Sequence, residues 1–69
     1  MHFKRLKELR EEHEYTQEYI ASYLKVNRIV YIRYENGNRE IPVSFLIKLS
    51  KLYNVSLDYI VENEKTSKV

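Results

Sequence analysis

Apolar residues recur along this chain at the three- and four-residue spacing of amphipathic helices, with short polar breaks between the repeats. One glycine and one proline among 69 residues leave little room for long irregular connections. The pattern predicts five helical segments, which cover residues 3–13, 16–24 and 27–36, then one from Pro42 and one from Ser56. The positions expected to face a shared core include Phe3, Leu6, Leu9, Ile20, Ala21, Leu24, Leu46, Leu49, Tyr53, Leu57 and Ile60. We therefore expect a compact all-α fold.

Residues at the predicted helix ends support these boundaries. Thr16, Asn27 and Ser56 can each accept a hydrogen bond from an amide in the first turn of the following helix. Gly37 tolerates a positive φ angle just after the third segment. Pro42 suits the first position of the fourth helix, where its missing amide donor is not needed.

The third segment has two chemically different faces. At about 100° per residue, one side gathers Asn27, Tyr31, Tyr34 and Glu35. The opposite side holds Ile29, Arg33 and Asn36, flanked by Val30 and Ile32. We expect the first face to be anchored in the domain. The second would present arginine, amide and methyl groups, which are chemically suited to base edges in the DNA major groove.

Residues 16–42, TQEYIASYLKVNRIVYIRYENGNREIP, resemble the helix-turn-helix of the Cro/C1-repressor family, also called the XRE family. The similarity continues upstream through LKELREE and downstream through LIKLSKLYNVSLDYI, and so covers essentially the whole chain. It rests on the joint spacing of L-x-x-L-R, T-Q, Y-E-x-G and V-S-L-D-Y. The resemblance implies a five-helix bundle of the lambda-repressor-like type. We place this domain at residues 1–63, followed by a polar tail at 64–69.

Arg33 is the first candidate for direct base reading, and Arg28 is the second because it lies near the helix end that usually enters the groove. The alternative is that both are solvated surface arginines. Ile29 and Val30 are candidates for contact with thymine methyl groups, whereas Ile32 should lie nearer the core. These aliphatic side chains could instead turn into the domain or meet a protein partner.

A second group of residues is expected to hold the DNA backbone. The resemblance implies that Gln17, at the start of the second helix, bonds a phosphate with help from the positive helix end. Asn36, Asn38 and Arg39 follow the third helix and could hold the same or the opposite strand. The alternative for both asparagines is turn chemistry, and the two roles are compatible.

The resemblance also suggests that Arg10 and Glu35 form an ion pair that ties the first helix to the third. Such a pair would orient the helices more than it stabilises them, because desolvation offsets much of the attraction. Two independent surface charges are the alternative. For Tyr31 and Tyr34 we favour a place in the core over stacking on bases.

Charge and composition narrow the remaining choices. Net charge is only +2, but residues 25–39 hold four basic residues against one acidic residue. Because cysteines are absent, disulfides and thiolate metal sites are excluded. His2 and His13 show no metal-ligand spacing, and neither a glycine-rich phosphate loop nor a serine–histidine motif is present. We expect no metal, no cofactor and no catalysis. The N-terminus has no apolar run, so we expect a cytoplasmic protein.

These observations predict a homodimeric transcriptional regulator that binds double-stranded DNA in a sequence-specific way. Repression is favoured over activation. Ile47, Leu52 and Tyr59 are candidates for the dimer surface because they fall outside the expected core. The main rival is a protein-interaction module or antitoxin that uses Ile29, Val30 and Ile32. Whether the chain is part of a longer protein with a sensing domain is left open.

Overall fold

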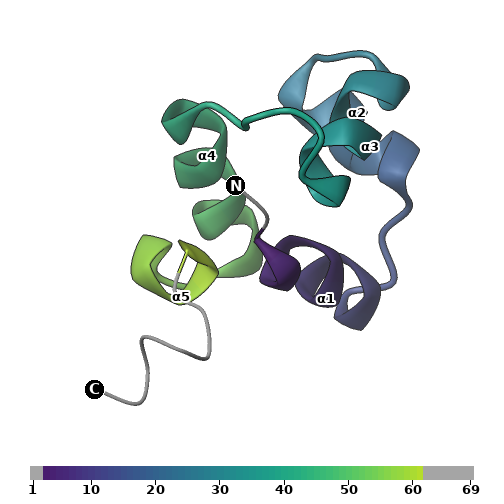
Figure 1. Ribbon diagram of the computed structural model, residues 1–69. Helices are drawn as coiled ribbons and strands as arrows, with labels where there is room; N and C mark the ends of the chain where they lie inside the picture. Colours follow the sequence, from purple (N-terminus) through teal and green to yellow (C-terminus); the bar gives the residue numbers. More distant parts are fainter. Residues whose placement is uncertain (1–2, 62–69) are drawn as a thin grey trace.

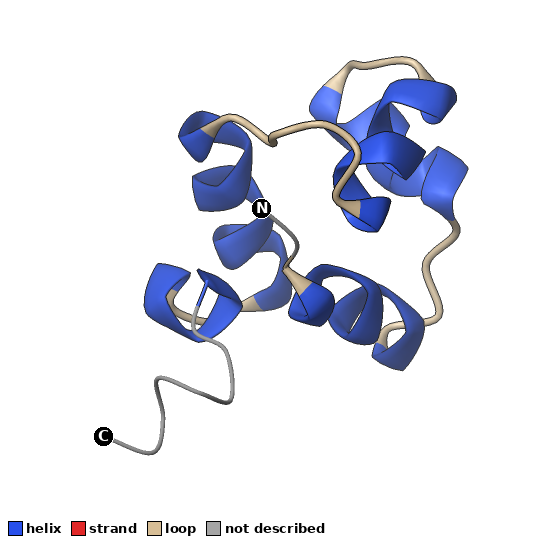
Figure 2. Cartoon of the chain, in the orientation of Figure 1, coloured by secondary structure: helices blue, strands red, loops and turns tan. Residues whose placement is uncertain are grey.

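The computed structural model describes residues 3–61 and folds them into five helices without a strand in that range (Figures 1 and 2). The helices are α1 (Lys4–Glu12), α2 (Gln17–Leu24), α3 (Arg28–Asn36), α4 (Val43–Tyr53) and α5 (Leu57–Val61). The all-α, five-helix prediction is confirmed. His2 and the predicted tail at 64–69 lie outside the described residues. No helix within 3–61 has the length and apolar character needed to cross a membrane.

The predicted side-chain caps are all formed. Thr16 and Ser56 each accept a hydrogen bond from the amide three residues ahead, both at 3.0 Å. Asn27 accepts one from the amide two residues ahead, at 2.7 Å. Gly37 has a φ angle of 81° at the end of α3, as expected. Pro42 is the residue before α4 rather than its first residue, because its ψ angle of 146° is extended.

A single core joins all five helices. Its buried apolar members are Leu6, Leu9, Ile20, Ala21, Leu24, Tyr31, Tyr34, Ile41, Leu46, Leu49, Tyr53 and Ile60. Most of these positions follow from helical spacing. Ile41 does not, since it lies in the loop between α3 and α4, and Phe3 and Leu57 pack against the core without being fully buried.

Helices α2 and α3 pack on each other at one end of the molecule, whereas α4 and α5 pack together elsewhere (Figure 1). Helix α1 contacts both groups, through α3 and through α5. Arg5 strengthens the second of these contacts, because its guanidinium donates to the Tyr59 carbonyl at 2.7 Å and lies 4.2 Å from the Tyr59 ring centre. The rest of the bundle therefore supports the α2–α3 pair.

Candidate nucleic-acid interface

A three-residue connection, 25–27, fixes the angle between α2 and α3. Lys25 has a left-handed backbone with a φ angle of 62°, and its amide donates to the Ser22 carbonyl at 3.1 Å. The Val26 amide then donates to the Ala21 carbonyl at 2.9 Å, and the Val26 side chain packs against the core. This pattern closes α2 and turns the chain directly into α3, where Asn27 caps the new helix.

Three of the four residues predicted for the inner face of α3 are buried, whereas the fourth, Asn27, is exposed. Tyr31 is fully buried, while Tyr34 and Glu35 are 6% and 3% exposed. The Tyr34 ring meets the Phe45 ring of α4 edge to face, with 6.1 Å between ring centres. Both tyrosines are therefore part of the core and not a stacking surface for bases.

The outer face of α3 is open to solvent. Arg28, Ile29, Arg33 and Asn36 are exposed, and Ile29 reaches 56% exposure despite its apolar side chain. Of the two aliphatic residues that flank this face, Ile32 was expected to lie nearer the core than Val30, and this expectation was wrong. Val30 is partly buried and packs against the core, although it flanks the outer face. Ile32 is also partly buried but is not among the residues packed against the core.

The loop after α3 closes that helix through its backbone. The amides of Asn38 and Arg39 both donate to the Arg33 carbonyl, at 2.9 and 3.2 Å. Turn chemistry is thus present here, as the alternative reading allowed. The side chains of Asn36, Asn38 and Arg39 are exposed, so the turn leaves them available for a further contact.

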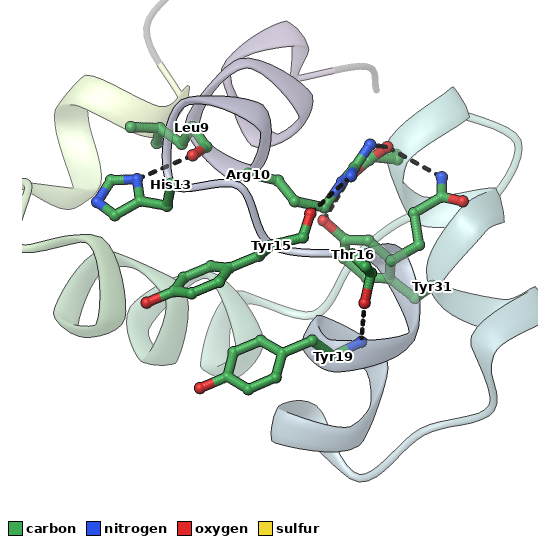
Figure 3. Close-up of polar contacts among 9 residues, drawn as sticks. Leu9, Arg10, His13, Tyr15, Thr16, Tyr19 and Tyr31 are labelled. Atoms are coloured by element: carbon green, nitrogen blue, oxygen red, sulfur yellow. Dashed lines mark hydrogen bonds and ion pairs between the residues drawn. The ribbon is translucent and has the colours of Figure 1, made fainter.

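Arg10 and Glu35 form the predicted ion pair between α1 and α3. Arg10 Nε donates to Glu35 Oε2 at 2.7 Å, and Nη2 donates to Oε1 at 3.3 Å. The third nitrogen of the guanidinium, Nη1, donates to the Tyr15 carbonyl at 2.9 Å. Figure 3 shows Arg10 extending from α1 toward the side chain of Tyr31. The pair thereby ties the loop before α2 as well as the two helices.

Two further donors complete the surroundings of the Glu35 carboxylate. The Tyr31 hydroxyl donates to Oε2 at 2.8 Å, and the Gln17 side-chain amide donates to Oε1 at 3.2 Å. Neither bond was predicted from the sequence. The Tyr31–Glu35 spacing of four residues on one helix was an available signal, since such residues are neighbours. The Gln17 bond crosses between α2 and α3 and has no comparable local signal.

Hydrogen bonding and burial raise the pKa values of three groups in or beside this cluster. The bond to Glu35 raises the pKa of Arg10 above its already high ordinary value, so the guanidinium is charged. Burial, and then the neighbouring Glu35 carboxylate, raise the pKa of Tyr31 far above its ordinary value of 10.0. Tyr31 is therefore a neutral donor. Burial likewise raises the pKa of Tyr53, with the Glu35 charge as the next cause.

The Glu35 pairing also shapes the charge that residues 25–39 present to solvent. Lys25, Arg28, Arg33 and Arg39 are all exposed. Glu35, the acidic residue of this stretch, is buried and neutralised by Arg10. Across residues 25–39 the exposed charged side chains are thus all basic, with the exposed Glu40 directly after them, although the chain carries a net charge of only +2.

Gln17 is the first residue of α2, and its side chain is partly buried. The first bond of the ladder runs from the Ile20 amide to the Thr16 carbonyl, so the amides before it lie at the positive end of the helix dipole. This end of α2 and the exposed face of α3 belong to the same helix pair. Candidate backbone and base contacts are thus built on one rigid unit.

The sequence pattern of the family described as helix-turn-helix matches residues 6–60. The chain is 38% identical over 69 residues to the uncharacterized HTH-type transcriptional regulator YqaE of Bacillus subtilis (strain 168), covering 100% of this chain and 60% of that protein. It is 42% identical over 65 residues to the HTH-type transcriptional regulator ImmR of the same organism, covering 94% and 51%. The chain thus spans between half and two thirds of these curated relatives.

Proposed function

The chain belongs to the helix-turn-helix family that matches residues 6–60, and we propose from this that it binds double-stranded DNA as a transcriptional regulator. The observation that carries the proposal is the division of α3. Its inner face is locked in the core by Tyr31, Tyr34 and Glu35, while Arg28 and Arg33 lie exposed on the same short helix. A rigid helix with an exposed arginine edge fits the major groove.

Base recognition would come from the exposed edge of α3. We assign Arg33 and Arg28 to guanine, because a guanidinium can donate to O6 and N7 together. Ile29 is the main candidate for a thymine methyl group, since its side chain is 56% exposed. Val30 is a secondary candidate through the part of its side chain that the core leaves uncovered.

Backbone contacts would flank this edge on both sides. Gln17 at the start of α2 supplies one contact, supported by the positive end of the helix dipole. Asn36, Asn38 and Arg39 supply others from the end of α3 and the loop after it. Contacts of this kind fix the register of the helix in the groove without reading sequence.

We further propose that the protein works as a homodimer in the cytoplasm and that repression is its effect. Two copies could read half-sites roughly 34–36 Å apart, one turn of the duplex. Of the three candidate dimer residues, Leu52 is partly buried, and Tyr59, although 41% exposed, has the Arg5 guanidinium over its ring. Ile47 is 41% exposed, and the 62% exposed Val43 lies one turn before it on α4. The α4 surface is therefore the better candidate.

A second function, docking of a protein partner, is favoured by the same exposed Ile29. Exposed apolar groups often mark protein contacts, and an antitoxin would need such a surface. The two functions respond differently to salt. Phosphate contacts release counterions, so DNA affinity falls steeply as salt rises, whereas an apolar protein contact does not.

Selection from random-sequence duplexes, followed by gel-shift titration at several salt concentrations, tests the proposal. We expect enrichment of a two-fold symmetric sequence. If the dimer neutralises about four phosphates with basic side chains, binding should weaken about a hundredfold between roughly 50 and 200 mM salt. Failure to enrich any sequence, or an affinity that does not respond to salt, would contradict DNA binding as the function.

A further inference from the structure

We propose that Glu35 is a positioning residue for DNA binding, which holds the side-chain amide of Gln17 ready to donate to a phosphate. The inference rests on the proposed function and concerns a residue that itself lies too deep to reach the duplex. Glu35 is 3% exposed, whereas Gln17 lies at the partly exposed start of α2. The bond between Gln17 Nε2 and Glu35 Oε1, 3.2 Å long, connects the two.

The chemistry of the carboxylate decides which way the Gln17 amide points. An ionised carboxylate only accepts hydrogen bonds, so the nitrogen of the amide, and not its oxygen, must face Glu35. The amide nitrogen carries two hydrogens. One is taken up by Glu35 Oε1, which fixes the position of the nitrogen and leaves the other hydrogen for an acceptor at the open end of α2. A phosphate oxygen there would complete the donor set.

The Glu35 carboxylate is itself held by three other hydrogen bonds, from two side chains. Arg10 binds both of its oxygens, and the Tyr31 hydroxyl donates to Oε2 at 2.8 Å. A support fixed in this way restricts Gln17 before any DNA arrives. A glutamine that is already ordered loses less conformational entropy on binding than one that is free.

Arg10 makes this arrangement compatible with a phosphate nearby. An unpaired carboxylate at the start of α2 would repel a phosphate and offset the attraction of the helix dipole. The charge of Arg10 cancels that of Glu35 at 2.7 Å. The ion pair thereby presents a directed donor to the duplex with no net negative charge behind it.

Position on α3 gives the arrangement a second consequence. Glu35 lies on the inner face of the helix that carries Arg33, and it bonds the first residue of α2. It therefore links the candidate phosphate contact of α2 to the candidate base contacts of α3. Glu35 thus adds a side-chain bond between the two helices that carry those contacts, in addition to the core packing that already joins them.

A thermodynamic cycle of DNA affinity tests this coupling. Gln17→Met is introduced into the wild-type protein and into the paired variant Arg10→Met/Glu35→Leu, and each protein is titrated against the selected duplex. The paired variant removes one positive and one negative charge, so all four proteins have the same net charge. Circular dichroism and thermal melting establish that each is folded.

The Gln17→Met change should weaken binding about tenfold in the wild-type background, the size of one charge-assisted hydrogen bond. In the paired variant it should weaken binding about twofold or less, because the glutamine is no longer held. Asn38→Ala is the matched control, since residue 38 does not touch Glu35, and its effect should be equal in both backgrounds. An equal tenfold loss from Gln17→Met in both backgrounds would overturn the inference, as would loss of the Asn38 effect in the paired variant.

A measurement on the wild-type protein covers the case in which the paired variant does not fold. In the nuclear magnetic resonance spectrum of the free protein, the Gln17 side-chain amide proton that is bound to Glu35 should lie downfield of its position in an unfolded chain. On addition of duplex, only the proton not bound to Glu35 should move strongly. Gln17 side-chain amide protons at the same positions as in an unfolded chain would overturn the inference alone. A wild-type protein that binds no duplex would overturn the proposed function, and the inference with it.

Discussion

The surroundings of Glu35 show how neighbouring residues fix the position of a single side chain. Its side chain is 2% exposed and that of Arg10 is 12% exposed, so both charges have left most of their water. Family resemblance predicted this pair. The Gln17 and Tyr31 bonds to the same carboxylate were not predicted, because three-dimensional packing determines which donors reach a buried acceptor.

Removing one member of the pair should be more harmful than removing both. Glu35→Leu leaves Arg10 charged and partly buried without its partner, which costs about 3–5 kcal/mol of stability. Adding Arg10→Met should recover most of that loss, since an apolar pair can replace a buried ion pair. Urea denaturation of the two single variants and the double variant measures the free energies of unfolding. Additive losses would show that the two side chains do not act as a unit.

Ile29→Ala should weaken binding selectively. Loss of the apolar contact with a thymine methyl group is expected to cost about 1 kcal/mol, roughly fivefold in affinity, at sites with a T·A pair beneath it. Gel-shift titration against duplexes that differ only at that pair measures the effect. Val43→Ala, which shortens an exposed side chain on α4, should leave the preference unchanged. Equal weakening by Ile29→Ala on every duplex would exclude base contact by this residue.

At the scale of elements, local signals predicted most of the helix boundaries. Thr16, Asn27 and Ser56 cap helices as expected, because a cap needs only a side-chain oxygen and a nearby amide. Burial at the edges of helices was harder to predict. Ile41 is buried from within a loop and Val30 is closer to the core than Ile32. Neither follows from spacing, because each depends on where a neighbouring helix lies.

The backbone of the turn between α2 and α3 is strained, and a substitution can relieve that strain. Lys25 adopts a φ angle of 62°, which is unfavourable for a residue with a Cβ atom. Lys25→Gly should raise stability by about 0.5–1 kcal/mol, after allowing for the greater freedom of glycine when unfolded. Thermal unfolding should show this as a rise of a few degrees in Tm.

Asn54 is the matched control for this prediction, since it has a similar φ angle of 58° at the end of α4. Asparagine tolerates the left-handed conformation better than lysine does. Asn54→Gly should therefore raise Tm by less than Lys25→Gly. A lower Tm for Lys25→Gly would mean that the lysine side chain contributes more than its backbone strain costs.

For the whole molecule, the sequence predicted the five-helix fold because periodicity, caps and turns agreed with one another. It could not predict that burial would change the acid–base behaviour of the core. Two tyrosines, Tyr31 and Tyr53, lie inside the bundle with their pKa values raised, mainly by burial. Both hydroxyls therefore stay protonated in the folded protein at a pH where the unfolded chain has begun to ionise.

This difference predicts a loss of stability at alkaline pH. The folded pKa of each tyrosine lies above the ordinary value of 10.0, so their contribution is complete below that pH and is lost as the pH rises above it. The free energy of unfolding should fall by up to about 1.4 kcal/mol per pH unit for each tyrosine. Urea denaturation between about pH 8 and 11 measures the slope.

Tyr53→Phe serves as the control, since it removes one of the two titrating hydroxyls and keeps the ring. Its slope above pH 10.0, the ordinary tyrosine pKa, should be roughly half that of the wild-type protein. An unchanged slope would assign the alkaline transition to other groups.

Whether α3 reads DNA is tested most directly by titrating the ¹⁵N-labelled protein with the selected duplex. The chemical-shift changes map the surface of the protein that touches the duplex. We expect the largest changes at the exposed edge of α3 around Arg28, Ile29 and Arg33, with further changes at Gln17 and in the loop at 38–39. Changes centred on the exposed α4 residues Val43 and Ile47, with the α3 edge unaffected, would contradict the claim that α3 reads DNA.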